Sequence, residues 1–185
     1  MARALLIIDI QRDYFPGGAY PLVEPERAAE NARRLLDAFR EGGEKILHLQ
    51  HVWDAPDATF MRPGTDGVEI HPLVAPADGE PVIEKAQPNG FLGTDLAAEL
   101  KARDVDTLVV AGMMSSMCVD ATVRAAVDQG LQATVVHDAC AAPNLEFAGA
   151  TIPGATVHGA FMAALADGYA TVTDADSLLS ATETG

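Results

Sequence analysis

The chain has 185 residues, of which 49% are hydrophobic and 21% charged, a composition typical of a globular domain rather than a disordered segment. Its net charge of −15 argues against binding nucleic acid or an anionic membrane. The apolar run in MARALLIIDI is too short for a signal peptide, and no stretch reaches the ~20 apolar residues that cross a bilayer. Because the chain has only two cysteines, we expect a cytoplasmic protein. From the net charge and the length of the apolar runs, we expect no nucleic-acid or membrane partner.

Segments with strand and helix patterns alternate along the chain. Residues 4–10, ALLIIDI, form a continuous apolar run typical of a strand that is buried on both faces. A helix is predicted from Pro25, which suits a first helical position, to the glycines at 42 and 43. The next two strands are predicted at 44–52 and 81–85, with a loop at 53–81.

The second half of the chain continues this alternation. Thr94 is a candidate N-cap for a helix within 93–104, where Leu96 and Leu100 lie four residues apart. The segment 112–130, GMMSSMCVDATVRAAVDQG, changes from a strand into an amphipathic helix that ends at Gly130. The remaining predicted elements are strands at 106–112, 132–139 and the start of 169–181, and helices at 156–168 and near Asp174.

This order of elements predicts one α/β domain over residues 1–185. The expected architecture is doubly wound and Rossmann-like, with roughly six mostly parallel strands and helices on both faces, in three layers. Parallel sheets bind ligands at the carboxyl ends of their strands. Asp9, Lys85 and Cys118 each lie at or just beyond the end of a predicted strand, so we expect them at the same edge.

Cys118 could be a small core residue or a nucleophile held at a helix start. A helix N-terminus favours the thiolate, and Ser115 or Ser116 could cap this helix. The Lys85 ammonium would favour the thiolate further, and the Asp9 carboxylate could accept the thiol proton and return it to a leaving group. Taken singly, each residue also has an ordinary structural interpretation, in the core, in a turn or at the surface.

Three segments resemble signature segments of the isochorismatase-like cysteine hydrolase superfamily, and in particular its nicotinamidase-related branch: LLIIDIQRDYF, PGTDGVEIHPLVAPADGEPVIEKAQPNGFLGTDL and LVVAGMMSSMCVDATVRAAVDQGLQATVVHDACAA. The superfamily includes nicotinamidases and N-carbamoylsarcosine amidases. The resemblance runs from about residue 4 to about residue 173, in the family's order. It implies the doubly wound fold, with Cys118 as nucleophile, Asp9 as base and Lys85 as the residue that orients them.

The resemblance also implies a cis peptide bond in the loop before the cysteine, at Met113–Met114. Its role would be to aim the Met114 backbone N–H, with that of Cys118, at a developing oxyanion. Gln11 matches a glutamine that commonly follows the family's aspartate, as a structural or substrate-side hydrogen bonder. The implied reaction is acyl transfer, in which Cys118 forms a thioester that water then hydrolyses with Asp9 as base.

Nicotinamidases usually carry a metal site after the second strand, built from an aspartate and two histidines. Here the aspartate and second histidine positions fall near Gln50 and Ala58, so that ligand set is not reproduced. His48, His51 and Asp54 could be a substitute, but His48 and His51 lie three apart on a strand and should point to opposite faces. We therefore expect no metal and no other cofactor.

Without a metal, the shape of the substrate pocket must come mainly from apolar side chains on loops near the strand ends. Aromatic residues in such loops can equally pack against another subunit. Cys140, which follows the fifth strand, is expected to be structural. The expected substrate-binding residues are Gln11, Phe15, Trp53, Phe91 and Met113, with Trp53 and Phe91 the better candidates.

The expected function is metal-independent, cysteine-dependent hydrolysis of a C–N bond in a small amide, ureide or lactam. Two alternatives stay open: vinyl-ether hydrolysis of an isochorismate-like substrate, which need not use Cys118, and a non-catalytic binding or assembly role on the same fold. The intact set of Asp9, Lys85 and Cys118 disfavours the non-catalytic role. Because family members usually form dimers or larger assemblies, we expect a homo-oligomer, and the small-residue helix face within 158–168 suits close packing or simply covers the sheet.

Overall fold

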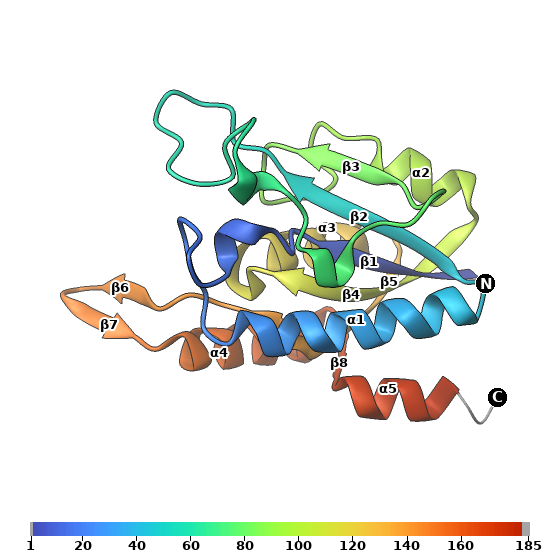
Figure 1. Ribbon diagram of the computed structural model, residues 1–185. Helices are drawn as coiled ribbons and strands as arrows, with labels where there is room; N and C mark the ends of the chain where they lie inside the picture. Colours follow the sequence, from blue (N-terminus) through green and yellow to red (C-terminus); the bar gives the residue numbers. More distant parts are fainter. Residues whose placement is uncertain (1, 183–185) are drawn as a thin grey trace.

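A computed structural model describes residues 2–182, which fold into three layers around one parallel sheet (Figure 1). The sheet order is β3-β2-β1-β4-β5-β8, so the chain winds outward from β1 in one direction and then returns to build the other half. This confirms the predicted doubly wound α/β fold with six parallel strands. The strands are β1 (Ala2–Ile8), β2 (Lys45–His51), β3 (Val82–Lys85), β4 (Val105–Met113), β5 (Gln132–Ala141) and β8 (Thr171–Thr173).

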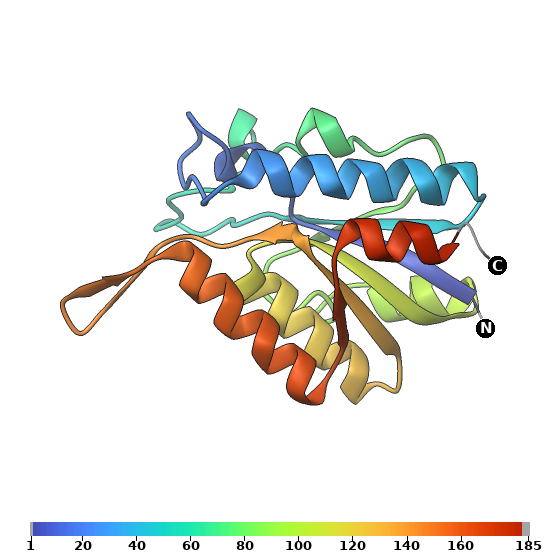
Figure 2. The ribbon, with the colours of Figure 1, turned by 90° about the horizontal axis from the view of Figure 1, so that it is seen from below.

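Helices cover both faces of the sheet, as Figure 2 shows. One face carries α1 (Pro25–Glu41) and α5 (Ala175–Thr182), and the other carries α2 (Leu96–Ala102), α3 (Asp120–Asp128) and α4 (Gly154–Gly168). Two expected helix starts are confirmed. Pro25 is the first residue of α1, and Asp174 caps α5 by accepting the Ser177 N–H at 2.8 Å. At α2 the prediction was off by one residue, because Asp95 rather than Thr94 is at the N-cap position, although the Leu96 N–H donates to the Thr94 hydroxyl at 3.3 Å.

The central strand β1 contributes to both hydrophobic cores. Leu5 and Ile7 pack beneath α1, whereas Leu6 and Ile8 pack beneath the helices of the opposite face. All four side chains are at most 2% exposed. Because neither face of β1 meets water, its sequence is an uninterrupted apolar run instead of an alternating one.

A hairpin formed by β6 (Leu145–Phe147) and β7 (Ala150–Ile152) was not predicted, and neither were three short 3-10 helices at Arg12–Tyr14, Asp66–Val68 and Pro72–Val74. The turn of the hairpin places Ala148 and Gly149 at positive φ, the conformation of a tight two-residue turn. The hairpin projects from the body of the molecule (Figure 1). Within residues 2–182, no helix combines the length and apolar character needed to cross a bilayer.

Candidate active site

The side chains of Asp9, Lys85 and Cys118 meet at the carboxyl edge of the sheet. Lys85 Nζ lies 2.7 Å from Asp9 Oδ2 and 3.3 Å from Cys118 Sγ. All three residues are buried, with Asp9 fully enclosed. The residues that shared only a position at strand ends in the sequence are therefore in direct contact in the structure.

Strand order brings these residues together. Asp9 follows β1 and Cys118 follows β4, and these two strands pair directly. Gly112, near the end of β4, allows them to approach closely, because a Cβ at this residue would lie 2.1 Å from the Ile8 carbonyl oxygen. Its φ of 148° also lies in a region that side chains rarely adopt. The loops that carry Asp9 and Cys118 therefore begin beside each other.

Asp9 leaves β1 with φ at 51°, in the left-handed region. This conformation is uncommon for residues other than glycine, and aspartate tolerates it better than most. The Asp9 N–H donates to the Leu49 carbonyl at 3.1 Å, and the Asp9 carbonyl accepts from the Gln11 N–H at 2.9 Å. These bonds hold the backbone in the turn that orients the carboxylate. Uncommon backbone conformations of this kind cluster at functional sites.

Cys118 lies on a tight turn between β4 and α3. The Met113–Met114 peptide bond is cis, as the family resemblance implies. Residues Ser115–Val119 then form one π-helical turn, in which the N–H groups of Met117 and Val119 both donate to the Met114 carbonyl, at 3.0 and 3.2 Å. The helix α3 begins only at Asp120. Cys118 therefore precedes the regular helix instead of lying in its first turn.

The prediction that Ser115 or Ser116 caps this helix is wrong. The Ser115 hydroxyl is within 3.0 Å of His158 Nδ1, on α4. The Ser116 hydroxyl is buried and has no hydrogen-bond partner among the described residues. The Met117 and Val119 N–H groups of this segment donate to the Met114 carbonyl, and no side-chain cap is found at the start of the π turn or of α3.

The site keeps the resting cysteine protonated. Burial raises the pKa of the Cys118 thiol, the Asp9 carboxylate raises it further, and the Lys85 ammonium only partly opposes them. Burial would lower the pKa of Lys85, but the adjacent Asp9 and Cys118 raise it by more. Lys85 therefore favours the thiolate, as expected. Its effect on the pKa of Cys118 is smaller than the combined effect of burial and Asp9. Deprotonating the thiol requires a base, and Asp9 is in place to act as one.

His51 completes the surroundings of Lys85, whereas its position in the sequence indicated only a possible metal ligand. His51 Nδ1 and the Gln87 carbonyl oxygen each lie 3.0 Å from Lys85 Nζ. Burial and the Lys85 charge lower the pKa of His51, so it is a neutral acceptor for the ammonium. His51 ends β2, the strand between β1 and β3, and pairs in register with Lys85. Knowledge of the strand order would have identified it.

Cys118 opens onto a cavity of about 680 Å³. Trp53, one of the expected substrate-binding residues, lies in its wall. The other aromatic side chains of the wall were not selected from the sequence, because they come from separate segments that converge only in the fold. They are Tyr14, Tyr20, Phe60 and Phe161.

Gln11 has a structural position. Its Nε2 donates to the carbonyl oxygens of His51, at 2.8 Å, and Val68, at 2.6 Å. Its Oε1 accepts the His51 N–H at 2.8 Å. These bonds occupy both ends of the amide and tie the end of β2 to the segment near Val68. Of the two roles expected for Gln11, the structure places it in the structural one.

The other three expected substrate-binding residues lie elsewhere. Phe15 stacks on His71, with ring centroids 3.9 Å apart, beside a separate hollow. Phe91 packs against the core beneath α2, and Met113 is fully buried in the core beneath α1. Within residues 2–182, these positions put all three outside the wall of the Cys118 cavity. Their positions therefore do not support the expected substrate contacts, and the three assignments stay predictions.

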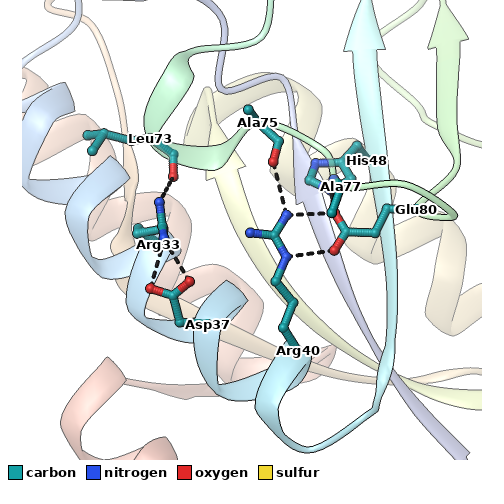
Figure 3. Close-up of polar contacts among 8 residues, drawn as sticks. All are labelled: Arg33, Asp37, Arg40, His48, Leu73, Ala75, Ala77 and Glu80. Carbon is teal, nitrogen blue, oxygen red and sulfur yellow. Dashed lines mark hydrogen bonds and ion pairs between the residues drawn. The ribbon is translucent and has the colours of Figure 1, made fainter.

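His48, His51 and Asp54 do not converge on a metal site. His48 Nε2 lies 2.9 Å from Glu80, which Arg40 of α1 also binds (Figure 3), whereas His51 faces Lys85. Asp54 is exposed. The two histidines therefore contact different groups on opposite sides of β2, as their spacing predicted.

A different donor set, Asp9, His51 and Cys118, has ligand atoms that all lie within 4.8 Å of one another. A set of this kind could hold a divalent metal. In this structure the Lys85 ammonium contacts a donor atom of each of the three residues. A metal ion would therefore have to displace Lys85, whose charge already balances the Asp9 carboxylate.

Cys140 lies away from this site. It is a buried free thiol whose Sγ donates to the Val136 carbonyl at 3.4 Å, and it borders a hollow beside His137 and His158. Burial raises its pKa to about 12. A protonated, enclosed thiol of this kind agrees with the structural role expected for it.

Comparison with known proteins assigns the family. The model of the isochorismatase domain matches residues 3–177. This chain belongs to the isochorismatase family. A Bacillus subtilis member of the family, YddQ, is 50% identical over 97% of this chain and 99% of its own length. An isochorismatase-family crystal structure from Oleispira antarctica is 47% identical, with a TM-score of 0.93, over 97% of this chain and 96% of that one.

Two further relatives of the family are named for their reactions. The streptothricin hydrolase of Streptomyces noursei is 36% identical and covers 89% of this chain and 60% of its own length. The maleamate amidohydrolase of Pseudomonas putida is 35% identical and covers 73% of this chain and 70% of its own length. The family relationship and the fold are thus established.

Proposed function

We propose that this protein is a cysteine-dependent hydrolase that cleaves a C–N bond of a small molecule through a thioester. The observation that carries the proposal is the buried contact of Lys85 with both Asp9 and Cys118, at 2.7 and 3.3 Å, beside an open cavity. The names of the maleamate amidohydrolase and streptothricin hydrolase relatives support a hydrolase function. The name of the maleamate amidohydrolase also supports an amide bond as the target.

The first half of the reaction forms the thioester. Asp9 removes the Cys118 proton as Sγ attacks the carbonyl carbon, and the carbonyl oxygen becomes an oxyanion. In this proposal the backbone N–H groups of Met114 and Cys118, two residues that line the cavity, stabilise that oxyanion. When the intermediate collapses, Asp9 donates its proton to the departing nitrogen and the C–N bond breaks. Lys85, in contact with both residues, orients Asp9 and Cys118.

The second half of the reaction hydrolyses the thioester. Asp9, again a carboxylate, takes a proton from water as the water oxygen attacks the thioester carbon. The bond between carbon and Sγ then breaks, and the Asp9 proton returns to Cys118. The products are the carboxylic acid and the amine, and the site regains its starting protonation.

The test is hydrolysis of a panel of small amides, including nicotinamide, carbamoyl amines and cyclic amides, with and without a chelator. Wild-type protein should release amine and acid, whereas Cys118→Ala and Asp9→Asn should lose turnover. Intact-mass spectrometry of wild type during turnover should detect the acyl group on Cys118, and Cys140→Ala is the matched control that should keep it. Undiminished activity of Cys118→Ala would overturn the proposal, and no turnover of any amide in the panel would favour vinyl-ether hydrolysis or a non-catalytic role.

A further inference from the structure

The wall of the Cys118 cavity lacks charged side chains. Among the described residues, its lining includes no arginine, lysine, aspartate or glutamate. Its polar side chains are those of Tyr14, Tyr20, His51, Gln87 and Ser116. Burial raises the pKa of Tyr14 and lowers the pKa of His51, so both are neutral near pH 7. A bound substrate therefore meets neutral groups around the nucleophile.

The nearby ammonium of Lys85 is not available to a substrate anion. It has three N–H donors, and Asp9 Oδ2, His51 Nδ1 and the Gln87 carbonyl oxygen lie within 3.0 Å of its Nζ. Its side chain has no exposed surface. A substrate carboxylate could reach it only by displacing one of these acceptors, and Asp9 is the proposed base.

Aromatic rings form one side of the cavity. The Tyr20 and Phe60 rings stack with centroids 4.9 Å apart, and Trp53 meets Phe60 edge-on at 5.4 Å. Flat ring faces carry partial negative charge and offer apolar surface. They favour a planar or apolar acyl group and disfavour an anion.

A buried polar atom beside the cavity also points to a neutral polar partner. The Ser116 hydroxyl is enclosed without a hydrogen-bond partner among the described residues, and Ser116 borders the cavity two residues from Cys118. A hydroxyl can donate to a carbonyl oxygen or accept from an amide N–H. An uncharged amide supplies both kinds of atom without the desolvation cost that a buried carboxylate would bring.

We propose that the cavity selects uncharged amides with an apolar acyl group and rejects substrates that carry a carboxylate. This proposal rests on the proposed function, because it names the substrate class of the same site. It also separates this chain from its maleamate-hydrolysing relative, whose named substrate is an anion. The chain's net charge of −15 also disfavours anionic substrates, because it repels anions from the whole surface.

The first test measures selectivity without requiring turnover. Iodoacetamide and iodoacetate alkylate the same sulfur but differ in charge, so their rates at Cys118 are compared with their rates at glutathione, at low and high salt. Cys118→Ala reports the alkylation of other sites. We expect a preference for iodoacetamide at least about tenfold above that of glutathione, which persists at high salt because it comes from the cavity. If the ratio of the iodoacetamide rate to the iodoacetate rate is the same at Cys118 as at glutathione, the proposal is overturned.

A matched substrate pair tests the same point in catalysis. Benzamide should be hydrolysed with a kcat/KM at least about tenfold above that of 4-carbamoylbenzoate, because only the latter carries a carboxylate into the cavity. If both are hydrolysed equally, the selectivity proposal fails while the proposed function stands. If no amide is hydrolysed but the alkylation preference holds, the proposed function fails and the neutral character of the cavity is upheld.

An added charge should change this selectivity. Leu145, on β6, borders the cavity and is only partly buried. Leu145→Arg should raise the relative rate of iodoacetate alkylation of Cys118, because it supplies the cation that the wall lacks. Leu145→Gln removes the same apolar side chain without adding charge and should keep the preference for iodoacetamide. If the ratio of the iodoacetate rate to the iodoacetamide rate at Cys118 is the same in Leu145→Arg and Leu145→Gln, the role assigned to the neutral wall is contradicted.

Discussion

Lys85 Nζ lies 2.7 Å from Asp9 Oδ2, and neither side chain has any surface exposed to solvent. Removing either charge from water alone would cost several kcal/mol, so each residue compensates for the burial of the other. The same ammonium contacts Cys118, whose thiol is protonated because burial and Asp9 raise its pKa. One buried contact therefore supports the folded site and holds the Asp9 carboxyl group beside the protonated thiol of Cys118.

Lys85→Met should destabilise the protein strongly. It leaves the buried Asp9 carboxylate without a counter-charge, a change that costs about 3–5 kcal/mol in the free energy of unfolding. The measurement is urea unfolding followed by circular dichroism. Lys101→Met, at an exposed position of α2, is the matched control and should change stability by less than about 0.5 kcal/mol.

Removing both charges separates stability from activity. The double variant Asp9→Asn with Lys85→Met should recover most of the stability that Lys85→Met loses, because no unpaired buried charge remains. It should still lack hydrolase activity, since the proposed base is gone. A Lys85→Met protein as stable as Lys101→Met would show that the ion pair does not support the fold.

His51 should matter for turnover because it accepts a hydrogen bond from Lys85. His51→Leu removes the hydrogen bond between Lys85 Nζ and His51 Nδ1, a bond to a charged group worth about 1.5–3 kcal/mol, and should lower kcat about 10- to 100-fold with little change in KM. His51→Asn offers an acceptor oxygen and should retain more of kcat. Steady-state kinetics on an amide identified by the panel measures both variants. If kcat falls equally in His51→Leu and His51→Asn, the acceptor role of His51 is contradicted.

The dependence of kcat/KM on pH gives a second test of the role of His51 as a neutral acceptor. Burial and the Lys85 charge lower its pKa from 6.5, so the neutral acceptor persists below pH 6.5. The logarithm of kcat/KM should therefore stay level as the pH falls through 6.5, and decline only at lower pH where His51 gains a proton. An acid limb at or above pH 6.5 in wild type that disappears in His51→Asn would contradict this assignment.

The sequence was sufficient for the fold and for the three central residues. Buried strands such as β1 are continuous apolar runs, and Asp9, Lys85 and Cys118 lie where parallel strands end, so their meeting follows from the architecture. His51 was rejected as a ligand from its spacing to His48, and its actual contact with Lys85 depends on β2 lying between β1 and β3. Spacing along one strand carries no information about neighbouring strands.

The cavity wall could not be predicted for a related reason. Tyr14 and Tyr20, Trp53 and Phe60, and Leu145 come from three separate segments, and their meeting depends on loop conformations that no periodicity encodes. Phe15 and Phe91 have the same residue type and a similar loop context, yet they pack elsewhere. Residue type alone therefore could not separate wall aromatics from packing aromatics.

The homo-oligomer expected from the sequence is testable through α4. This helix buries Val157, Met162 and Leu165 but leaves Ala160 and Ala163 exposed, so the small-residue face does not simply cover the sheet. We expect a dimer or larger assembly in size-exclusion chromatography with light scattering. Ala163→Arg should weaken it, whereas Ala98→Arg, at an exposed position of α2, should not. A monomeric wild type would contradict the prediction.

Glu80 should make the stability of the protein depend on acid pH. Burial would raise the pKa of Glu80, but Arg40, the Ala77 N–H and His48 lower it from 4.5 to about 2 (Figure 3). A carboxylate with a depressed folded-state pKa stabilises the native state above pH 4.5, and this contribution is lost as the pH falls toward 2. Its upper limit is on the order of 3 kcal/mol.

Glu80→Gln should therefore reduce the free energy of unfolding at pH 7 and reduce it much less at pH 3, where wild-type Glu80 has lost most of its advantage. Urea titrations at several pH values between 7 and 3 measure this convergence. Glu84→Gln, at an exposed position of β3, is the control and should follow wild type throughout. A wild-type advantage over Glu80→Gln that is constant across this range would mean that packing, rather than the charge of Glu80, holds the 72–80 segment against β2 and α1.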